Sequence, residues 1–259
     1  MPDYLDVLAN NAMKAIEEGY YETSTKISAP RRSLKEAIMR CERIPVISEV
    51  KFASPTTGAL RRKNDLKRIA RDMEEGGAVG ISVLTETKHF GGHIRFVSEI
   101  RDKVNLPILM KDLVLSSRQI DAASRTGANA ILLIQTLFER GYCEKDVQSM
   151  IDHSHSRDLE VLLEVHTEDD FLSALKTEAD MIGINNRNLK TLEVDLDVTK
   201  RILTKYRIKD KVIVSESGID SPEDIRFLRE CGARAFLVGT VIMKASNIKE
   251  KVKELVEAL

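Results

Sequence analysis

The feature that most constrains the fold is a series of eight short apolar runs, each separated from the next by a longer polar or amphipathic stretch. The runs are rich in β-branched residues and cover residues 45–50, 79–84, 107–110, 130–134, 160–165, 181–184, 212–216 and 235–238. Most of them are apolar throughout, which is typical of strands covered on both faces. The series therefore predicts eight strands of a parallel sheet.

Helix-like segments lie between these runs. They cover residues 65–75, 117–125, 145–157, 168–177, 195–206, 222–231 and 247–258. Several end at glycine, and the stretch 221–224 (SPED) has the cap, the first-turn proline and the acidic residues of a helix start. Strand–helix units repeated eight times favour a closed (β/α)8 barrel, the TIM barrel, over the alternative of an open doubly wound α/β sheet.

The length of the chain, 259 residues, is near the usual size of one such barrel. Residues 45–259 are expected to form the barrel. Residues 1–44 precede the first strand and predict a helical extension, with helices at 4–18 and 33–43, that covers one end of the barrel. We therefore expect a single domain overall.

The charge balance argues against several classes of partner. Lysine plus arginine number 40 and aspartate plus glutamate 41, so no net charge attracts nucleic acid or an anionic membrane. No apolar run approaches the ~20 residues of a membrane span, and the acidic, mixed N-terminus does not resemble a secretory signal. The three cysteines, Cys41, Cys143 and Cys231, are widely spaced and fall on expected helices, which predicts packed thiols in a cytoplasmic protein.

Ionisable and other polar side chains recur where the expected strands end, which is where barrels of this kind carry their chemistry. They are Glu49 and Lys51 at the first strand, Lys111 at the third, Glu164 at the fifth, Asn185 and Arg187 at the sixth, and Glu216 and Ser217 at the seventh. A lysine after a strand is by itself usually a solvated charge, and Glu164 by itself could be a structural partner of Arg187. Five strand ends with inward ionisable groups instead indicate an acid–base set.

Small residues after the last two strands point to a phosphate site. Gly218 follows the seventh strand, and Gly239 and Thr240 follow the eighth. Glycine lets backbone amides approach a dianion, and the loops after these two strands form the common phosphate site of barrel enzymes. We expect a phosphorylated small molecule as the ligand.

Other features do not point to a metal or a cofactor. His153 and His155 lie two apart on an expected helix and so point different ways. His89 and His93 flank two glycines in a loop without accompanying acids or cysteines, which favours solvated side chains. No glycine-rich nucleotide motif follows the first strand. We therefore expect neither a metal nor an organic cofactor.

Eight segments around these strand ends together resemble the indole-3-glycerol phosphate synthase family of tryptophan biosynthesis. In chain order they are SEVKFASPTTG, LTETKHFGG, PILMKDL, ANAILLIQ, LLEVHTEDD, IGINNRNLKTLEVD, VSESGI and AFLVGTVIM. The resemblance covers about residues 30–245, and the INNRNL and KDL segments are its most specific parts. The helical extension also fits, because members of this family carry helices there that cover the substrate.

The resemblance implies a role for each matching residue. Lys111 would be the general acid for ring closure, Glu164 its carboxylate partner, Lys51 a contact to the substrate carboxylate or phosphate and an acid for dehydration, and Glu49 a base or orienting group. The family's polar wall, aromatic contacts and phosphate cradle would then include the remaining matches. These are Asn185, Arg187, Glu216, Ser217, Ser54, Leu132, Leu113, Gly218, Gly239 and Thr240.

The implied reaction closes the indole ring of 1-(2-carboxyphenylamino)-1-deoxyribulose 5-phosphate, with loss of carbon dioxide and water, and needs no cofactor. We expect a carboxy-lyase that works as a monomer. The sequence departs from the family at Ala53, where lysine is common, at Leu113, where phenylalanine is usual, and at Thr240, where serine is common. These changes affect affinity and loop behaviour and leave every acid–base group in place.

Two rival functions remain for comparison. Phosphoribosylanthranilate isomerase is another phosphate-binding barrel, but its chemistry requires a cysteine near the first strand, where this chain has Lys51. A non-catalytic or engineered phosphate-binding barrel derived from the same family is the other alternative. The intact Lys51, Lys111 and Glu164 argue against it.

Overall fold

All eight expected strands are present and form a closed parallel barrel in the computed structural model, which describes residues 3–24, 26–27, 30–206, 208 and 210–258. The barrel strands are β1 (Val46–Val50), β4 (Gly80–Leu84), β5 (Ile108–Lys111), β6 (Ala130–Ile134), β7 (Glu160–Val165), β8 (Met181–Asn185), β9 (Val212–Glu216) and β10 (Ala235–Val238). Each pairs in parallel with its sequence neighbour, and β1 closes the ring by pairing with both β4 and β10. The predicted (β/α)8 barrel is confirmed.

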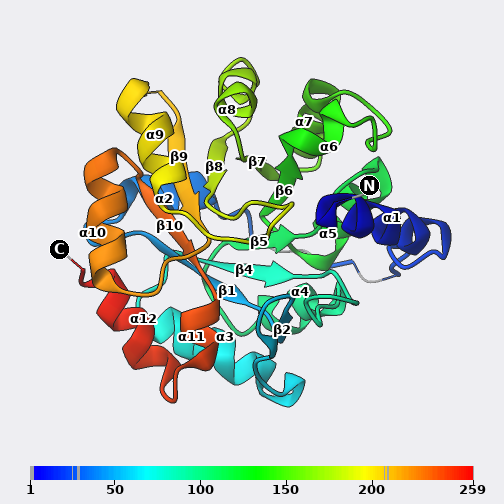
Figure 1. Cartoon of the computed structure of the whole chain (residues 1–259). Coiled ribbons are helices and arrows are strands. Elements are labelled where there is room, and N and C mark those ends of the chain that lie inside the picture. The colour runs from blue at the N-terminus through cyan, green and yellow to red at the C-terminus, as the bar shows by residue number, and fades with distance from the viewer. Residues whose placement is uncertain (1–2, 25, 28–29, 207, 209, 259) are drawn as a thin grey trace.

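Helices form an outer ring around these strands (Figure 1). They are α3 (Leu66–Glu75), α4 (Arg95–Arg101), α5 (Ser117–Thr126), α6 (Gln135–Glu139), α7 (Val147–Ser156), α8 (Glu168–Ala174), α9 (Asp197–Lys205), α10 (Pro222–Cys231), α11 (Thr240–Lys244) and α12 (Ile248–Val256). Ser221 caps α10 by accepting from the Asp224 amide, as its sequence predicts. Among the described residues, no helix combines the length and the apolar character that a membrane crossing needs.

Side chains fill the inside of the barrel as a core of their own. Ile47, Leu109, Leu132, Leu162 and Val214 are all nearly or fully buried there. Because successive residues of a strand point to opposite faces, the next inward position toward the carboxyl end comes two residues later. That position holds Glu49, Lys111, Glu164 or Glu216 on four of the strands, so the apolar core ends in a layer of charged groups.

The N-terminal extension reaches both ends of the barrel, whereas the sequence predicted that it covers one end. Helix α1 (Tyr4–Glu17) lies at the carboxyl ends of the strands and buries Leu5 and Leu8 against the interior core. Helix α2 (Leu34–Arg40) lies at the amino ends and buries Leu34 and Ile38. Both helices present one apolar stripe, and the barrel has an open end on each side that such a stripe can cover.

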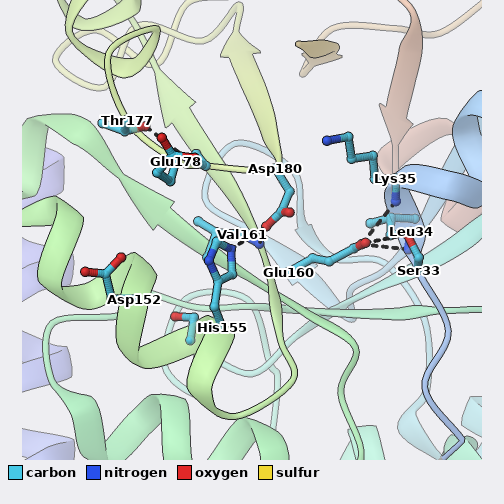
Figure 2. Close-up of polar contacts among 12 residues, drawn as sticks. Ser33, Leu34, Lys35, Asp152, His155, Glu160, Val161, Thr177, Glu178 and Asp180 are labelled. Carbon is cyan, nitrogen blue, oxygen red and sulfur yellow. Dashed lines mark hydrogen bonds and ion pairs between the residues drawn. The ribbon is translucent and has the colours of Figure 1, made fainter. Parts of the chain in front are cut away.

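A carboxylate at the start of β7 fixes α2 in place (Figure 2). Glu160 accepts hydrogen bonds from the Leu34 amide at 2.7 Å and the Lys35 amide at 3.1 Å, and from the Ser33 hydroxyl. These amides belong to the first turn of α2 and have no partner inside the helix. Burial raises the pKa of Glu160, and the three donors act against that rise.

Several of the shortest elements were not predicted from the sequence. They are the hairpin of β2 (Ala53–Ser54) with β3 (Gly58–Ala59), the turn η1 (Lys63–Asp65), and helices α4, α6 and α11, of five to seven residues each. Segments this short carry too little periodicity to be recognised. Strands β5 and β8 also run one residue further than predicted, so Lys111 and Asn185 are the last residues of regular strands.

Replacing Leu34 by alanine should lower the free energy of unfolding by about 2–5 kcal/mol, because the side chain is fully buried and its loss leaves a cavity at the amino end of the barrel. Urea unfolding followed by circular dichroism measures this change. Met39→Ala on the same helix is the control, because Met39 is 55% exposed and its truncation should stay within about 0.5 kcal/mol. Equal effects of the two changes would contradict the packing described here.

Candidate active site

A cavity of about 400 Å³ opens at the carboxyl ends of the barrel strands. Every residue that the sequence proposed for the site lines it. These are Glu49, Lys51, Ser54, Lys111, Leu113, Leu132, Glu164, Asn185, Arg187, Glu216, Ser217, Gly218, Gly239 and Thr240. The structure thus brings residues from seven barrel strands or the loops that follow them into one space large enough for a small molecule.

The centre of the cavity is an ion triad of one lysine and two glutamates. The Nζ atom of Lys111 lies 3.0 Å from Oε2 of Glu164 and 3.4 Å from Oε2 of Glu216. Glu164 and Glu216 are 2% and 1% exposed. Strands β5, β7 and β9 hold the three side chains from different parts of the ring, so the barrel itself sets the geometry of this Lys111 triad.

The triad shifts the pKa values of its two carboxyl groups in opposite directions. Burial by itself would lower the pKa of Lys111, but the two carboxylates and the nearby Glu49 raise the pKa above its usual value, so the ammonium stays charged. Burial acts to raise the pKa of Glu164, and the charge of Lys111 outweighs it and brings that pKa below its usual value. Burial raises the pKa of Glu216 to about 8, with repulsion from Glu164 adding to the effect.

The carboxyl groups of Glu164 and Glu216 also differ in their hydrogen bonds. Glu164 accepts a hydrogen bond from Nδ2 of Asn185 at 3.0 Å, and Nε2 of His166 lies 3.2 Å from the same oxygen. Neither oxygen of Glu216 has a hydrogen-bond partner among the described residues. Glu164 is therefore held in place, while Glu216 keeps the capacity to bond a ligand.

Glycine at position 183 makes room for Glu216. A Cβ atom built on Gly183 would lie 2.1 Å from Oε1 of Glu216, a distance at which the carboxyl group would have to move. Gly183 occupies an inward position of β8, two residues before Asn185. Neither Gly183 nor His166 was predicted from the sequence, although His166 follows Glu164 at the two-residue period of one strand face.

A second ion pair lies beside the triad, on β1. The Nζ atom of Lys51 is 2.9 Å from Oε1 of Glu49, and Glu49 is 5% exposed. A Cβ atom at Gly239 would lie 2.6 Å from Oε1 of Glu49 and 3.0 Å from Nζ of Lys51. The absence of a side chain at Gly239 therefore leaves open the space between the end of β10 and this pair.

Arg187 supplies a third cation at the rim of the cavity. Its amide donates to Oδ1 of Asn185 at 3.0 Å, and Nη1 donates to the Leu192 carbonyl at 2.7 Å. An antiparallel bridge between Arg187 and Val194 folds this loop back on itself. Burial lowers the pKa of the half-buried guanidinium, which still remains charged at neutral pH, and Glu49 and Asp220 act against the decrease.

The chain turns sharply after β9, where the sequence predicted part of a phosphate cradle. Ser217 has a φ of 67° and Gly218 a φ of 78°, so two successive residues are left-handed. A left-handed serine is strained backbone of the kind that clusters at binding sites. Across the cavity rim, Thr240 is the first residue of α11, and the Lys51 ammonium lies near this end of β10.

An apolar wall completes the cavity on the side of the N-terminal extension. It comprises Tyr4, Leu5 and Leu8 of α1, Phe90 of the loop after β4, and the predicted Leu113 and Leu132. Only Leu113 and Leu132 of these six were predicted from the sequence, because an amphipathic helix does not reveal which surface it covers. Leu113 contributes an aliphatic side chain to this wall.

The four histidines that the sequence did not favour as metal ligands have partners of other kinds. His153 lies 3.0 Å from Asp121 and His155 2.9 Å from Asp180, so the two point to different partners, as predicted (Figure 2 for His155). His89 and His93 were expected to be solvated, and this is wrong. Both are half-buried, because rings of the N-terminal extension pack on them: Tyr4 on His89 and Tyr20 on His93.

The thiols follow the expectation in part. Cys231 is the last residue of α10 and Cys41 caps α2, but Cys143 lies in the loop between α6 and α7 rather than on a helix. All three are half-buried and reduced. Over the described part of the chain, no group of three or more histidine, cysteine or acidic side chains has the arrangement of a metal site.

Comparison with known proteins identifies the family of this chain. Residues 6–255 match the family model described as indole-3-glycerol phosphate synthase. This chain belongs to the indole-3-glycerol phosphate synthase family. The resemblance inferred from the strand-end segments is confirmed.

Individual relatives agree with this assignment. The chain is 42% identical over 227 residues to the indole-3-glycerol phosphate synthase of Methanocaldococcus jannaschii, a match covering 86% of this chain and 82% of the relative. It is 41% identical to the enzyme of that name from Pyrococcus furiosus, over 87% of this chain and 97% of the relative. For the enzyme from Shouchella clausii the identity is 37%, over 94% of each chain.

Solved structures similar to this chain include more distant barrels. A thiamine phosphate pyrophosphorylase from Pyrococcus furiosus superposes with a TM-score of 0.59 at 17% identity, over 85% of this chain and 96% of that one. An N-acetylmannosamine-6-phosphate 2-epimerase from Clostridium perfringens gives 0.60 at 15% identity, over 83% and 93%. At these identities the likeness concerns the fold.

Glu216→Gln should make the free energy of unfolding less dependent on pH. A carboxyl whose pKa is about 8 in the folded state and near 4.5 when unfolded binds its proton more tightly when folded. Its contribution to stability is therefore complete below pH 4.5 and is lost as pH rises to about 8. Urea unfolding between pH 5 and 9 should show a decline with pH in the wild type that is shallower in Glu216→Gln. The exposed-site variant Glu42→Gln is the control, and a slope unchanged by Glu216→Gln would contradict the raised pKa.

Proposed function

We propose that this member of the indole-3-glycerol phosphate synthase family converts 1-(2-carboxyphenylamino)-1-deoxyribulose 5-phosphate to indole-3-glycerol phosphate with the residues of this cavity. The observation that carries the proposal is the Lys111 triad, in which a charged ammonium lies 3.0 Å from the buried Glu164 carboxylate and 3.4 Å from the buried carboxyl group of Glu216. The reaction is a carbon–carbon bond formation with loss of carbon dioxide and then of water. Its steps require a cationic acid, a carboxylate partner and a second acid–base pair.

Lys111 acts first, as the acid of ring closure. The ring carbon that bears the carboxylate attacks the ribulose carbonyl, and the carbonyl oxygen gains negative charge. An ammonium whose charge is secured by the Glu164 carboxylate, with Glu216 and Glu49 close by, is suited to stabilise and protonate that oxygen. Glu164, fixed by Asn185, faces the positive charge that develops on the substrate as the ring closes.

Lys51 and Glu49 serve the later steps. Once carbon dioxide has left, the new hydroxyl departs as water and the ring loses a proton to become aromatic. The 2.9 Å pair of Lys51 and Glu49 offers an acid for the first event and a base for the second. Glu216, whose oxygens accept no hydrogen bond from the described residues, would receive a hydroxyl group of the substrate chain.

Charge supports an anionic substrate. Lys51, Lys111 and Arg187 carry three positive formal charges at neutral pH, while Glu49 and Glu164 carry two negative ones. Glu216 is largely protonated at pH 7, because its pKa is about 8. The net charge of this set is therefore about +1, which favours a ligand that carries a carboxylate and a phosphate.

The phosphate would bind at the end of the cavity formed by Ser217, Gly218, Gly239 and Thr240, with Lys51 close by. Backbone amides that follow small residues suit a dianion. The aromatic ring would lie against the apolar wall at the other side, including Leu113 and Leu132. Ser54 would border the ring end, and Arg187 and Asn185 the substrate carboxylate.

The wider setting is proposed in the same terms. Residues 1–44 would be an appendage of a single barrel domain that extends to residue 259, because both of its helices pack on the interior core. The protein would act in the cytoplasm as a monomer. A non-catalytic barrel of the same family has no observation in its favour, because the acid–base groups are intact and face one cavity.

Lys111→Ala should lower turnover by ~10²–10⁴ while the barrel stays folded, because the reaction loses its cationic acid. Steady-state kinetics that follow indole fluorescence, with far-ultraviolet circular dichroism for the fold, measure both effects. Lys190→Ala is the matched control, because Lys190 is an exposed lysine of the loop after β8. Near-normal turnover of Lys111→Ala would remove this residue from the mechanism.

Inorganic phosphate should compete with the substrate, raising the apparent KM without changing kcat, because it occupies the cradle of Gly218, Gly239 and Thr240. Thr240→Val should weaken this competition several-fold, since it removes a hydroxyl from the first turn of α11. Initial rates at millimolar phosphate provide the measurement, with equal concentrations of chloride salt as the control. Absence of competition would count against the cradle.

A further inference from the structure

Two tyrosines join the N-terminal extension to the strand ends beside Lys111. The hydroxyl of Tyr20 donates to the carbonyl oxygen of Thr85 at 3.0 Å and accepts from the Ile94 amide at 2.7 Å. The hydroxyl of Tyr21 donates to Oδ2 of Asp112 at 2.9 Å. Both acceptors immediately follow a barrel strand, Thr85 after β4 and Asp112 after β5.

Asp112 is a buried carboxylate that depends on hydroxyl groups. It is 2% exposed, and no ion pair reaches it from the part of the chain that the structure describes. Its Oδ2 atom accepts from the hydroxyl groups of Tyr21 and Thr85, and its Oδ1 atom accepts from the Leu113 amide at 2.8 Å. Burial raises the pKa of Asp112 to about 6, and these three donors act against the rise. Loss of a donor would leave a buried charge poorly compensated.

Thr85 closes the network around Lys111. Its hydroxyl donates to Asp112, its carbonyl accepts from Tyr20, and its amide donates to the carbonyl oxygen of Lys111 at 3.1 Å. The backbone is thus held twice on the carboxyl side of Lys111, by the Thr85 amide at the Lys111 carbonyl and by the bonded side chain of Asp112, the next residue. We call Tyr20, Tyr21, Thr85 and Asp112 the tyrosine clasp.

We propose that the tyrosine clasp positions the general acid, with Tyr21, Thr85 and Asp112 acting as positioning residues for Lys111. The inference rests on the proposed function, in which the Lys111 ammonium must reach the substrate carbonyl. Tyr21 and Thr85 do not line the cavity, so they act through the backbone of β5 rather than by touching the substrate. A lysine side chain is flexible, so the position of its ammonium group is well defined only if the backbone is fixed.

The size of the effect follows from the sensitivity of catalysis to distance. Misplacing a catalytic group by about 1 Å can lower a rate by roughly 10²-fold. Loss of one hydrogen bond in the clasp should displace Lys111 by less, so we expect kcat to fall about 10-fold. KM should stay within about two-fold, because the apolar wall and the phosphate cradle are untouched.

Isosteric substitutions at Thr85 give the sharpest test. Thr85→Val removes the hydroxyl and keeps the shape of this fully buried side chain, whereas Thr85→Ser keeps the hydroxyl. Thr85→Val should lower kcat about 10-fold at nearly constant KM, and Thr85→Ser should retain most of the wild-type kcat. Equal kcat values for the valine and serine variants would overturn the proposal.

A second pair of variants separates positioning from mere attachment of the extension. Tyr21→Phe breaks the clasp. Tyr142→Phe breaks a bond of the same kind, from the Tyr142 hydroxyl to Asp6 of α1 at 3.0 Å, which attaches the extension to the barrel away from β5. Only Tyr21→Phe should lower kcat. An equal decrease in both would mean that attachment of α1, and not the position of Lys111, controls the rate.

Hydrogen exchange tests the clasp without any turnover. The Thr85 amide, bonded to Lys111, should exchange faster in Tyr21→Phe and Thr85→Val than in the wild type, and at the wild-type rate in Tyr142→Phe. Peptides that cover residues 80–90 report this by mass spectrometry. A wild-type protein without turnover would overturn the proposed function, and unchanged exchange at Thr85 would separately overturn the clasp.

Discussion

The structure depends on holding one ammonium group, that of Lys111, between two carboxyl groups inside a barrel. A charge this deeply buried is unfavourable unless it is paired, and the pair itself needs further hydrogen bonds. Glu164 meets that requirement, with Asn185 bonded to its second oxygen. Glu216 meets it only in part, because its pKa is raised and its oxygens accept no hydrogen bond within the part of the chain that the structure describes. The site therefore contains one fixed carboxylate and one that is ready to change partner.

Barrel closure makes this arrangement achievable from residues far apart in sequence. Each strand ends at the same rim, and each contributes one inward position just above the apolar core. Lys111, Glu164 and Glu216 come from three strands, yet the Nζ atom of Lys111 lies 3.0 Å from Oε2 of Glu164 and 3.4 Å from Oε2 of Glu216. The glycine at position 183 completes the geometry, because any side chain there would collide with Glu216. The N-terminal extension then covers the rim with α1, and its Tyr20 and Tyr21 bond Thr85 and Asp112 beside Lys111.

Much of this could be predicted from sequence because the barrel repeats one simple rule. Apolar runs reveal the strands, and the two-residue period places Glu49, Lys111 and Glu164 on the inner face at the rim. The extension was harder, because the amphipathic pattern of α1 and α2 does not tell which surface each helix covers, and they proved to cover opposite ends. Gly183 and Thr85 could not be recognised, since their importance lies in a contact with a residue from another strand. The predictions for Cys143 and His89 were wrong for another reason: both residues lie in loops, and loops have no periodic pattern that reveals burial.

The charge state of Lys111 is the most direct test of this account. Lysine labelled with ¹³C at Cε would report the protonation of each side chain by NMR, and Lys111→Arg would identify the Lys111 signal. The two neighbouring carboxylates predict that Lys111 remains an ammonium to a higher pH than exposed lysines, which titrate near 10.4. In Glu164→Gln its titration should move to lower pH. A Lys111 signal that titrates near pH 7, or that ignores the loss of Glu164, would contradict the account.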